Sequence, residues 1–576
     1  MAKNIRSFST TTSLSSRDVF TTSPQQREQS PNDRLLVVGS GVAGSAAALI
    51  AAETYKIPVT MIYAGNLPTD CNSYWAQGGI IYRNYHPAAG DSAASLAADI
   101  HRAGSGLCDD PAVQKVSTQG PDRVRQLLLD GDFAQVPFDR LPTGELSLCL
   151  EASHAAPRIL HRADHTGRTI TEHISEAVAR HPLINQAAHT IVTDLIVDDN
   201  VCVGVETLDR LTGQQSRIMG AAGTVLASGG LAGIYQHSTN PAGFNALGSS
   251  VALARRAGVD TADLEYVQFH PTALYIPNEA RFLLSEALRG EGAVLRNHTG
   301  RAFARDYHED GELAPRDVVA RAVFEESQKT GQPVVLDITH RDADWLHGRF
   351  PSIHQHLQQR GLDLSTDTLP ITPAAHYTCG GVATDLSGRT NLKGLYAAGE
   401  AARTGLHGGN RLASTSLLEG LVFGASVADF VGSEEGRDVR NETAQLLESV
   451  NSGTGFKNNV SNMASLEPVH IENAAHRAMQ LLGELRRIMW DNVGVVRTPS
   501  GLKSALEELN EIREEAIDLH ATYPTLETAA VRDAAYSGHA VADAALTNRT
   551  SVGAHCIVPD AESDSDEDEP AAAAGR

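Results

Sequence analysis

The feature that most constrains the fold lies near the start of the chain, where a glycine-rich turn separates a β-branched segment from a run of small helix formers. Residues 34–38 (RLLVV) lead into Gly39-Ser40-Gly41-Val42-Ala43-Gly44, and the alanine-rich residues 45–52 follow. This order predicts a strand, a tight turn at Gly39, a close approach of a pyrophosphate at Gly41, and close helix packing at Gly44. The helix N-terminus then faces the phosphates. The pattern predicts a Rossmann-like dinucleotide site with contacts from Gly39, Ser40, Gly41, Ala43 and Gly44.

The next predicted strand, residues 59–63, ends without the acidic residue that holds a ribose 2′-hydroxyl in many such sites. The motif therefore does not choose between FAD and NAD, and the ribose contact must come from elsewhere. A later segment, residues 395–400 (LYAAGE), again has a strand followed by glycine and an acid. We expect Glu400 to make the missing ribose contact.

Composition excludes several classes of protein. The 576 residues carry 47 Lys and Arg against 70 Asp and Glu, a net charge of −23, which argues against nonspecific nucleic-acid binding. No uncharged apolar run approaches the length of a membrane helix, so no membrane association is expected. The six cysteines include no CxxC pair, which favours reduced thiols over a disulfide framework or a zinc site.

Both ends of the chain differ from the rest in amino-acid composition. Residues 1–32 are rich in Ser, Thr and Arg, and they read either as a disordered extension of a cytoplasmic protein or as a transit peptide to a plastid or mitochondrion. Residues 558–576 form an acidic, alanine-ended tail that we expect to be disordered. Between about 467 and 550 the chain lacks glycine-rich loops and predicts packed helices.

Further glycine pairs and small polar residues predict loops held close to a flat ligand. They are Asn72, Ser73, Ala76, Gln77, Gly78 and Gly79 in one loop, Gly229 and Gly230 after a strand at 224–228, and Ser414, Ser416 and Leu417 at the start of a helix over 414–424. Residues 188–197 and 201–209 alternate like strands about a turn at 198–200, and we expect the strand ending at 224–226 to complete this meander and return to the nucleotide sheet.

Two polar segments are candidates for chemistry. Residues 151–171 are rich in His, but they lack a metal-ligand spacing, so no metal site is predicted; helical spacing would place Arg158 and Arg162 on one face, near phosphate. In residues 268–321 we single out one His, one hydroxyl and two Arg, which together favour an anion site. The residues singled out there are His270, Ser285, Glu286, Arg289 and Arg316. Pro315 suits a first helical turn, which would carry Arg316.

The ordered segments GSGVAGSAAA, WAQGGI, QFHPTAL, LLSEALRGEG, ELAPRDVVAR, HYTCGGV, GLYAAGE and GGNRLASTSLLEG closely resemble the flavoprotein family of fumarate reductases and succinate dehydrogenases, from about residue 35 to 560. The resemblance implies an α/β fold: a Rossmann-like FAD-binding domain (33–263 and 379–447), an inserted α+β capping domain (264–378), and a C-terminal helical bundle (448–557). Asn72 stands where the respiratory dehydrogenases have the His that carries covalent flavin, so the resemblance implies noncovalent FAD.

Within the family, the segment from Glu151 to His161 is similar to the branch that oxidises L-aspartate, with Ala152-Ser153 in place of that branch's Gly-Gly. The resemblance implies oxidation of L-aspartate to iminoaspartate, with hydride passing from Cα to flavin N5 and with O2 or fumarate as acceptor. This is the first step of NAD (quinolinate) biosynthesis, and it implies a quinolinate-forming partner enzyme.

The same resemblance assigns roles to the polar residues. His270 and Ser285 would bind one substrate carboxylate, His376 and Arg411 the other, and Glu151 the ammonium. Arg316 would be the proton donor to fumarate, with Glu286 and Arg289 as its relay; the alternative for the last two is a surface ion pair.

Two other functions compete with this one. The first is a soluble fumarate reductase or succinate dehydrogenase flavoprotein, which shares every motif except the Glu151 segment. The second is a flavin-binding interaction protein without turnover. The sequence leaves monomer and homodimer equally open.

Overall fold

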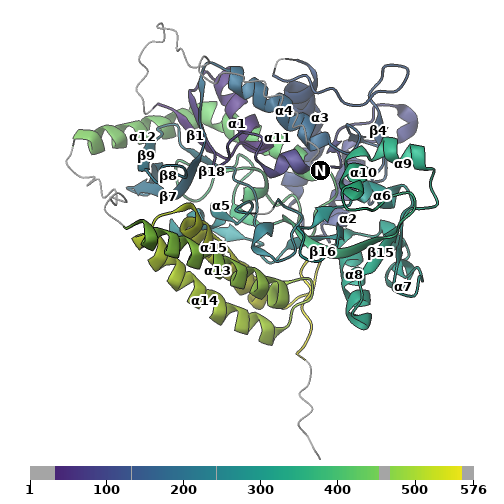
Figure 1. Ribbon diagram of the computed structural model, residues 1–576. Helices are drawn as coiled ribbons and strands as arrows, with labels where there is room; N and C mark the ends of the chain where they lie inside the picture. The colour runs from purple at the N-terminus through teal and green to yellow at the C-terminus, as the bar shows by residue number, and fades with distance from the viewer. Residues whose placement is uncertain (1–32, 132, 242, 453–466, 561–576) are drawn as a thin grey trace, which may run out of the picture.

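The computed structural model describes residues 33–131, 133–241, 243–452 and 467–560 (Figure 1). The expected strand, turn and helix at the start of the chain are confirmed as β1 (Leu35–Val38) and α1 (Val42–Glu53). β1 lies at the centre of a parallel sheet with strand order β18-β10-β1-β2-β6. The other strands are β2 (Val59–Ile62), β6 (Ile184–Ala187), β10 (Thr224–Leu226) and β18 (Leu395–Ala397). Because parallel strands end at one edge, the loops after β1, β10 and β18 meet there.

The helix α11 (Thr415–Gly432) packs against α1 beside this sheet. It is long and apolar enough by composition to cross a membrane, yet 78% of it is buried inside the molecule. Leu421, Val422 and Phe423 are fully buried in the same core cluster as Leu49 and Ile50 of α1. α11 is therefore a core helix of the nucleotide-binding part. α2 (Ala93–Ala103), α3 (Asp110–Val124), α4 (Thr166–Arg180) and α12 (Glu434–Ser452) complete the larger helices of this part.

The meander differs from the expectation at its third strand. β7 (Thr190–Asp198) and β8 (Val201–Asp209) pair as predicted, but β8 then pairs with β9 (Gln215–Met219). The strand assigned to the meander from the sequence, β10, does not pair with β8, but it lies in the nucleotide sheet as expected, where it pairs with β1. β9 is short and polar, with no fully buried residue, so it lacks the apolar pattern by which a strand is recognised.

A second five-stranded sheet, ordered β13-β12-β16-β15-β14, forms the core of the inserted part, at the right of Figure 1. Its strands are β13 (Phe282–Leu283), β12 (Val267–Leu274), β16 (Leu369–Thr378), β15 (Val334–Asp337) and β14 (Val294–Arg296). Its helices are α6 (Glu286–Gly290), α7 (Ala304–Tyr307), α8 (Arg316–Thr330), α9 (Ala343–Arg349) and α10 (Pro351–Gln358). All neighbours in this sheet are antiparallel, in contrast to the nucleotide sheet.

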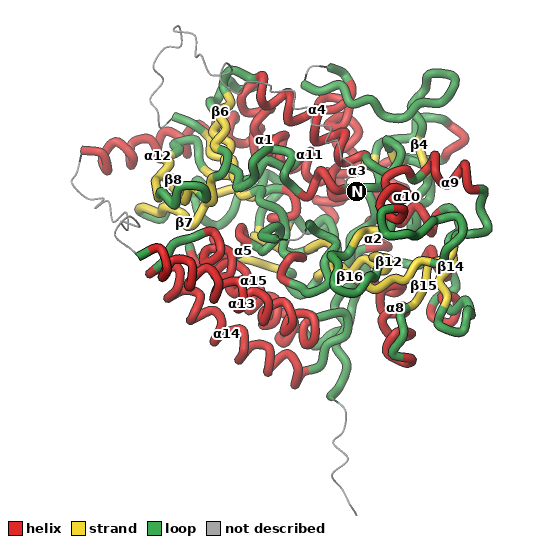
Figure 2. The backbone as a smooth tube through the Cα atoms, in the orientation of Figure 1, coloured by secondary structure: helices red, strands yellow, loops and turns green. Residues whose placement is uncertain are grey.

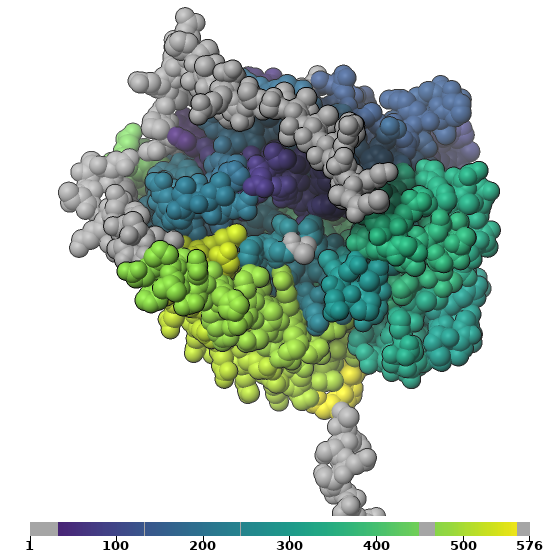
Figure 3. Space-filling view, in the orientation of Figure 1, coloured from purple at the N-terminus to yellow at the C-terminus, as the bar shows by residue number. Residues whose placement is uncertain are grey.

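Three long helices, α13 (Pro468–Val493), α14 (Pro499–Thr522) and α15 (Leu526–Thr547), pack together as the sequence predicts. Figure 2 shows them side by side, and in Figure 3 their yellow-green surface and the green surface of the inserted part flank the same face. Leu482, Leu509 and Val531 contribute one residue from each helix to a shared core that also contains Phe269 of β12. The bundle therefore supports the inserted sheet as well as itself.

Small sheets and a helix connect these parts. They comprise β3 (Ile80–Ile81), β4 (Leu148–Cys149) and β5 (Ile159–Leu160) in one sheet, β11 (Thr261–Ala262), β17 (Gly381–Ala383) and β19 (Ala402–Arg403) in another, and the helix α5 (Ser249–Arg256).

The end of the described chain returns to the middle of the molecule. The Ala554 N–H donates to the Gly409 carbonyl at 2.8 Å, and Arg321 of α8 donates through Nη1 to the Gly553 carbonyl, also at 2.8 Å. This segment therefore joins the loop before Arg411 to the helix that begins at Arg316. The expectations for residues 1–32 and 561–576 lie outside the described residues.

Candidate active site

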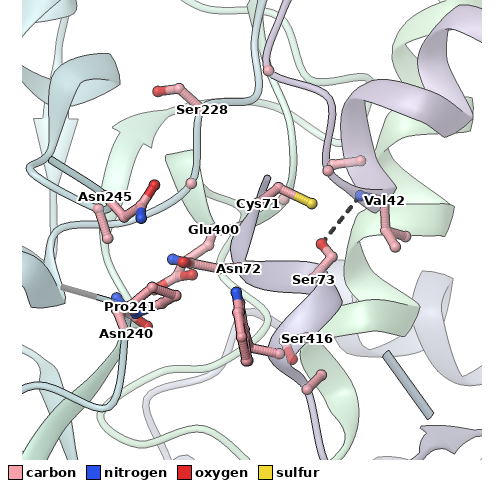
Figure 4. A pocket seen from close by; sticks show the side chains of 18 of the residues that line it. Val42, Cys71, Asn72, Ser73, Ser228, Asn240, Pro241, Asn245, Glu400 and Ser416 are labelled. Atoms are coloured by element: carbon pink, nitrogen blue, oxygen red, sulfur yellow. Dashed lines mark hydrogen bonds between the residues drawn. The ribbon is translucent and has the colours of Figure 1, made fainter. Parts of the chain in front are cut away.

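The loops at the ends of β1, β10 and β18 open into a cavity of about 700 Å³ that extends to the inserted sheet. Figure 4 shows part of this cavity, with Asn72, Glu400, Asn240 and Pro241 among the labelled residues that line it. Most residues singled out from the sequence line it: Gly39, Ser40, Gly41, Ala43, Asn72, Ser73, Ala76, Gln77, Gly78, Gly79, Glu151, Gly229, His270, Ser285, Glu286, Arg316, His376, Glu400, Arg411, Ser414, Ser416 and Leu417. Gly44, Gly230 and Arg289 are not among the lining residues.

The glycine-rich turn has the geometry that a close backbone approach requires. Gly39 has φ +116°, and a Cβ there would lie 2.2 Å from the Ala227 carbonyl oxygen. A Cβ on Gly44 would lie 2.1 Å from the Gly39 carbonyl oxygen, so this glycine allows α1 to pack on the turn. The Val42 N–H at the start of α1 donates to Ser73 Oγ at 3.2 Å (Figure 4). The turn thus fits a pyrophosphate, because the helix N-terminus opens into the cavity.

The loop from Asn72 supplies unused polar groups. Asn72 Oδ1 and Gln77 Oε1 are buried and have no hydrogen-bond partner among the described residues. Buried polar atoms are normally paired, so these oxygens fit a bound ligand with donor groups. FAD offers such donors in its ring and ribityl hydroxyls.

Glu400 lines the cavity directly after β18, and its ribose contact stays a prediction. β18 lies two strands from β1, on the side opposite β2. The Glu400 carboxylate accepts the Thr378 N–H at 3.0 Å. Burial raises the pKa of Glu400 to about 7, and Arg411 partly opposes this.

His270 presents a free donor to the cavity. The Thr272 N–H donates to Nδ1 of His270 at 3.3 Å, so the neutral ring carries its proton on Nε2. Nε2 is buried and has no partner within the described part of the chain. Burial, followed by Arg316, lowers the pKa of His270 well below its usual value. His270 is therefore a neutral donor suited to an anionic oxygen.

Arg411 is held from several sides. It donates through Nη1 to Ser416 Oγ at 3.1 Å and through Nη2 to Nε2 of His376 at 3.0 Å, and its guanidinium lies 4.3 Å from the ring centre of Tyr377. Since Nε2 of His376 accepts, its Nδ1 proton points to Thr239 Oγ1 at 2.7 Å. His376 thus orients Arg411 in this structure. Tyr377 and Thr239 were missed in the sequence, because their partners lie far away in the chain.

A buried ionic chain runs from Arg316 into the inserted part. Arg316 begins α8, with Pro315 as its N-cap instead of in the first turn. Arg316 Nε donates to Glu286 Oε2 at 2.5 Å, and Arg289 lies 3.4 Å from Glu286 Oε1. Glu286 is 4% exposed and Arg289 1%, so they are not a surface pair.

The Glu312 carbonyl and the Gln268 side chain hold the two ends of this row of charged side chains. Arg289 Nη1 donates to the Glu312 carbonyl at 2.5 Å, and Arg316 Nη1 donates to Gln268 Oε1 at 2.9 Å. Gln268 is fully buried and also donates to Asn410 Oδ1 at 2.6 Å and to the Arg411 carbonyl at 2.7 Å. Gln268 links Arg316 to Arg411. Apart from its place two residues before His270, no local pattern indicates this role.

Glu151 enters the cavity from a different segment. Its Oε2 accepts the Ser414 hydroxyl at 2.6 Å, and its Oε1 would be 2.9 Å from a Cβ on Gly78. Burial raises the pKa of Glu151, although the Ser414 hydroxyl opposes the rise. Ser153, where the resembling segment has glycine, has φ +65°, a left-handed conformation that glycine adopts more easily. The loop reaches its position in spite of this side chain.

The expectation of a helical Arg158–Arg162 face near phosphate is wrong. Arg158 precedes β5 and is fully buried against Asp91 at 3.1 Å and Asp99 at 2.9 Å. Arg162 pairs with Asp139 at 2.8 Å, and α4 begins only at Thr166. Neither arginine lines the cavity. Their partners come from other segments, and these contacts override the local helical spacing.

Comparisons with known proteins agree with this geometry. A family model described as FAD binding domain matches residues 34–417, and one described as Fumarate reductase flavoprotein C-term matches residues 483–568. An L-aspartate oxidase of Yersinia pestis is 38% identical over 85% of this chain and 88% of its own length. A chloroplastic L-aspartate oxidase of Nicotiana tabacum is 37% identical, with 91% and 81% covered. Among solved structures, the E. coli quinol fumarate reductase flavoprotein is 27% identical with a TM-score of 0.78, covering 92% of this chain and 91% of that one.

Proposed function

Because this chain belongs to the FAD-dependent flavoprotein family that includes the L-aspartate oxidases and the fumarate reductases, we propose that it oxidises L-aspartate to iminoaspartate. It is an oxidoreductase with FAD as cofactor. The observation that carries the choice of substrate is the buried Glu151 carboxyl, which lines the same cavity as His270 and Arg411. Succinate has no group that would need this carboxyl, whereas aspartate has an ammonium.

The substrate's two carboxylates find complementary partners in the cavity. His270 offers its Nε2 proton, and Ser285, the N-cap of α6, offers a hydroxyl nearby. Arg411 offers a planar fork that matches a carboxylate, held in orientation by His376 and Ser416. Burial, followed by Arg316, lowers the pKa of Arg411 to about 10, so it remains charged at neutral pH.

The ammonium of aspartate would be costly to bury without an anionic partner. Glu151 supplies that partner, and its charge is favoured by Arg316 and Arg411 across the cavity. The carboxyl therefore selects an amino acid and orients its Cα. When bound, FAD supplies the two-electron acceptor that takes the hydride from this carbon.

With fumarate as acceptor, a proton must reach the carbon next to the one that receives the hydride. Arg316 lies in the cavity, and Glu286 and Arg289 behind it form a continuous chain of charged groups. An arginine holds its proton throughout the working pH range, so it acts as an acid only if Glu286 returns the proton at once. The short contact between Arg316 and Glu286 favours this relay.

The wider setting is part of the proposal. We infer that O2 or fumarate serves as the acceptor, that the product passes to a quinolinate-forming enzyme, and that the chain acts as a monomer or homodimer in the cytoplasm. Relatives include bacterial and chloroplastic proteins, so residues 1–32 decide the compartment. Fusing these residues to a fluorescent reporter tests this, since import into an organelle would contradict a cytoplasmic location.

The direct test of the activity is anaerobic. The purified yellow protein is mixed with L-aspartate, and separately with succinate, while the flavin absorbance is followed. Bleaching by aspartate alone is expected. Bleaching by succinate alone would assign the protein to the dicarboxylate dehydrogenases and leave Glu151 without its role.

A further inference from the structure

A second, much smaller cavity lies against the first. Its volume is about 10 Å³, close to the space that the centre of one water molecule needs. Gln77, Gly78, Glu151 and Ser285 line both cavities, so the Glu151 carboxyl forms part of the wall between them. The far side of the small cavity is lined by His161 and Cys149, among others.

His161 connects this cavity to the surface. Its Nδ1 lies 3.1 Å from Asp139 Oδ2, and its Nε2 lies 3.5 Å from Ser147 Oγ. The His161 side chain is 12% exposed, whereas that of Asp139 is 27% exposed. The small cavity therefore has the Glu151 carboxyl and the His161 ring among its lining groups, and Asp139 beside His161 is partly exposed to solvent.

Aspartate oxidation needs such a route. An ammonium has no lone pair to stabilise the positive charge that develops at Cα when a hydride leaves, so the nitrogen must first lose a proton. The large cavity offers Glu151 as the nearest acceptor in the proposed binding mode. Arg316, Glu286 and Arg289 form a chain of charges in the inserted part, and that chain is suited to delivering a proton to fumarate.

We propose that the proton released by the substrate ammonium leaves through Glu151, one water molecule in the small cavity, and His161, and that it reaches solvent at Asp139. This inference rests on the proposed function. One N–H bond of the ammonium breaks, one O–H bond forms on Glu151, and the proton then passes through the water to the imidazole. No electrons are transferred in these steps, and the neutral amine is left ready for oxidation.

The electrostatic surroundings agree with this direction of transfer. Burial raises the pKa of Glu151, with Glu286 adding to the rise while Ser414, Arg316 and Arg411 oppose it, so its carboxylate holds an incoming proton well. Burial, followed by Arg349, lowers the pKa of His161, while Asp139 opposes this. A lowered pKa favours the neutral imidazole, the form that can accept a proton.

The test separates the two half-reactions in the holoenzyme. Flavin bleaching by L-aspartate and reoxidation of the reduced protein by fumarate are each measured by anaerobic stopped flow, in H2O and in D2O. In His161→Gln, bleaching is expected to slow on the order of 10²-fold with a changed solvent isotope effect, while fumarate reduction stays within about 2-fold. His165→Gln is the control, because His165 is half-buried in the same segment but lines neither cavity.

Two further variants keep the test decisive. In His161→Ala, added imidazoles are expected to restore bleaching, in proportion to their basicity, which a merely structural role would not produce. In Cys149→Leu, the added side-chain volume fills the small cavity and bleaching slows again. Normal bleaching in all three variants, or equal loss of both half-reactions, overturns the route. Wild-type protein that aspartate fails to bleach overturns the proposed function itself.

Discussion

Glu286 and Glu151 line the same cavity and are equally buried, at 4% exposure each, yet their surroundings push their pKa values in opposite directions. Burial alone would raise the pKa of Glu286, but Arg316 and Arg289 outweigh it and hold the value below the usual range. Glu151 has only a hydroxyl within hydrogen-bonding distance, so burial prevails and its pKa rises. Two identical side chains are thereby prepared for opposite tasks, one inside a permanent ion pair and one ready to gain a proton.

The largest expected effect comes from removing Arg316, the ion-pair partner of Glu286. Arg316→Leu should lower turnover with fumarate by about 10²- to 10⁴-fold, because the proposed proton donor is lost. FAD should stay bound, which the visible absorbance of the purified variant reports. Since Glu286 would be left buried without its partner, the double variant Arg316→Leu/Glu286→Gln controls for instability. Near-normal turnover would remove Arg316 from its role.

The next effect concerns Glu151, the carboxyl that has a hydroxyl as its hydrogen-bond partner. Glu151→Gln should lower kcat/KM for aspartate by roughly 30- to 1,000-fold, the equivalent of about 2–4 kcal/mol for losing a buried charge partner of the ammonium. Fumarate reduction should change by less than about 3-fold. Steady-state assays with each substrate measure the split, and equal losses in both reactions would favour the fumarate reductase alternative.

A third carboxyl tests whether the absence of a close cation is what raises the pKa at Glu151. Glu400 is half-buried and has no ion pair among the described residues, and desolvation raises its pKa to about 7. Because the pKa of Glu400 is higher in the folded state than in the unfolded state, this carboxyl stabilises the folded protein at pH values below about 4.3, the ordinary pKa of a glutamate. The stabilisation is lost as pH rises to about 7. In FAD-free protein, the free energy of unfolding of Glu400→Gln should therefore increase by about 3 kcal/mol relative to that of wild type as pH rises from 4 to 8. Urea unfolding across that range measures the difference, and parallel curves for both proteins would contradict it.

The smallest effect is at the loop that carries Glu151. Ser153 has φ +65°, so Ser153→Gly should raise the free energy of unfolding by about 1 kcal/mol. Urea midpoints measure this, and Ser153→Ala serves as the control because it retains the strain. No gain in the glycine variant would mean that local contacts already favour the left-handed conformation.

Sequence reasoning succeeded where the information was local. The Gly39 turn, the helices of the C-terminal bundle and the Arg316 helix each follow from neighbouring residues. It failed where partners are distant, as for Arg158, whose partners Asp91 and Asp99 lie about 60 residues away. It also missed Gln268, which joins two arginines that lie 95 positions apart. Nothing in the local pattern distinguishes that glutamine from an ordinary strand residue.

The contact between the Gly553–Ala554 segment and the Gly409 loop matters for how the chain is made. Synthesis proceeds from the N-terminus at about 5–20 residues per second, so the loop that carries Arg411 is made roughly 7 to 30 seconds before Ala554. During that interval the loop and α8 lack the hydrogen bonds that the Gly553–Ala554 segment makes to both of them. A premature stop codon between Arg411 and Gly553 would yield a chain that contains both Arg316 and Arg411 but lacks this bridging segment.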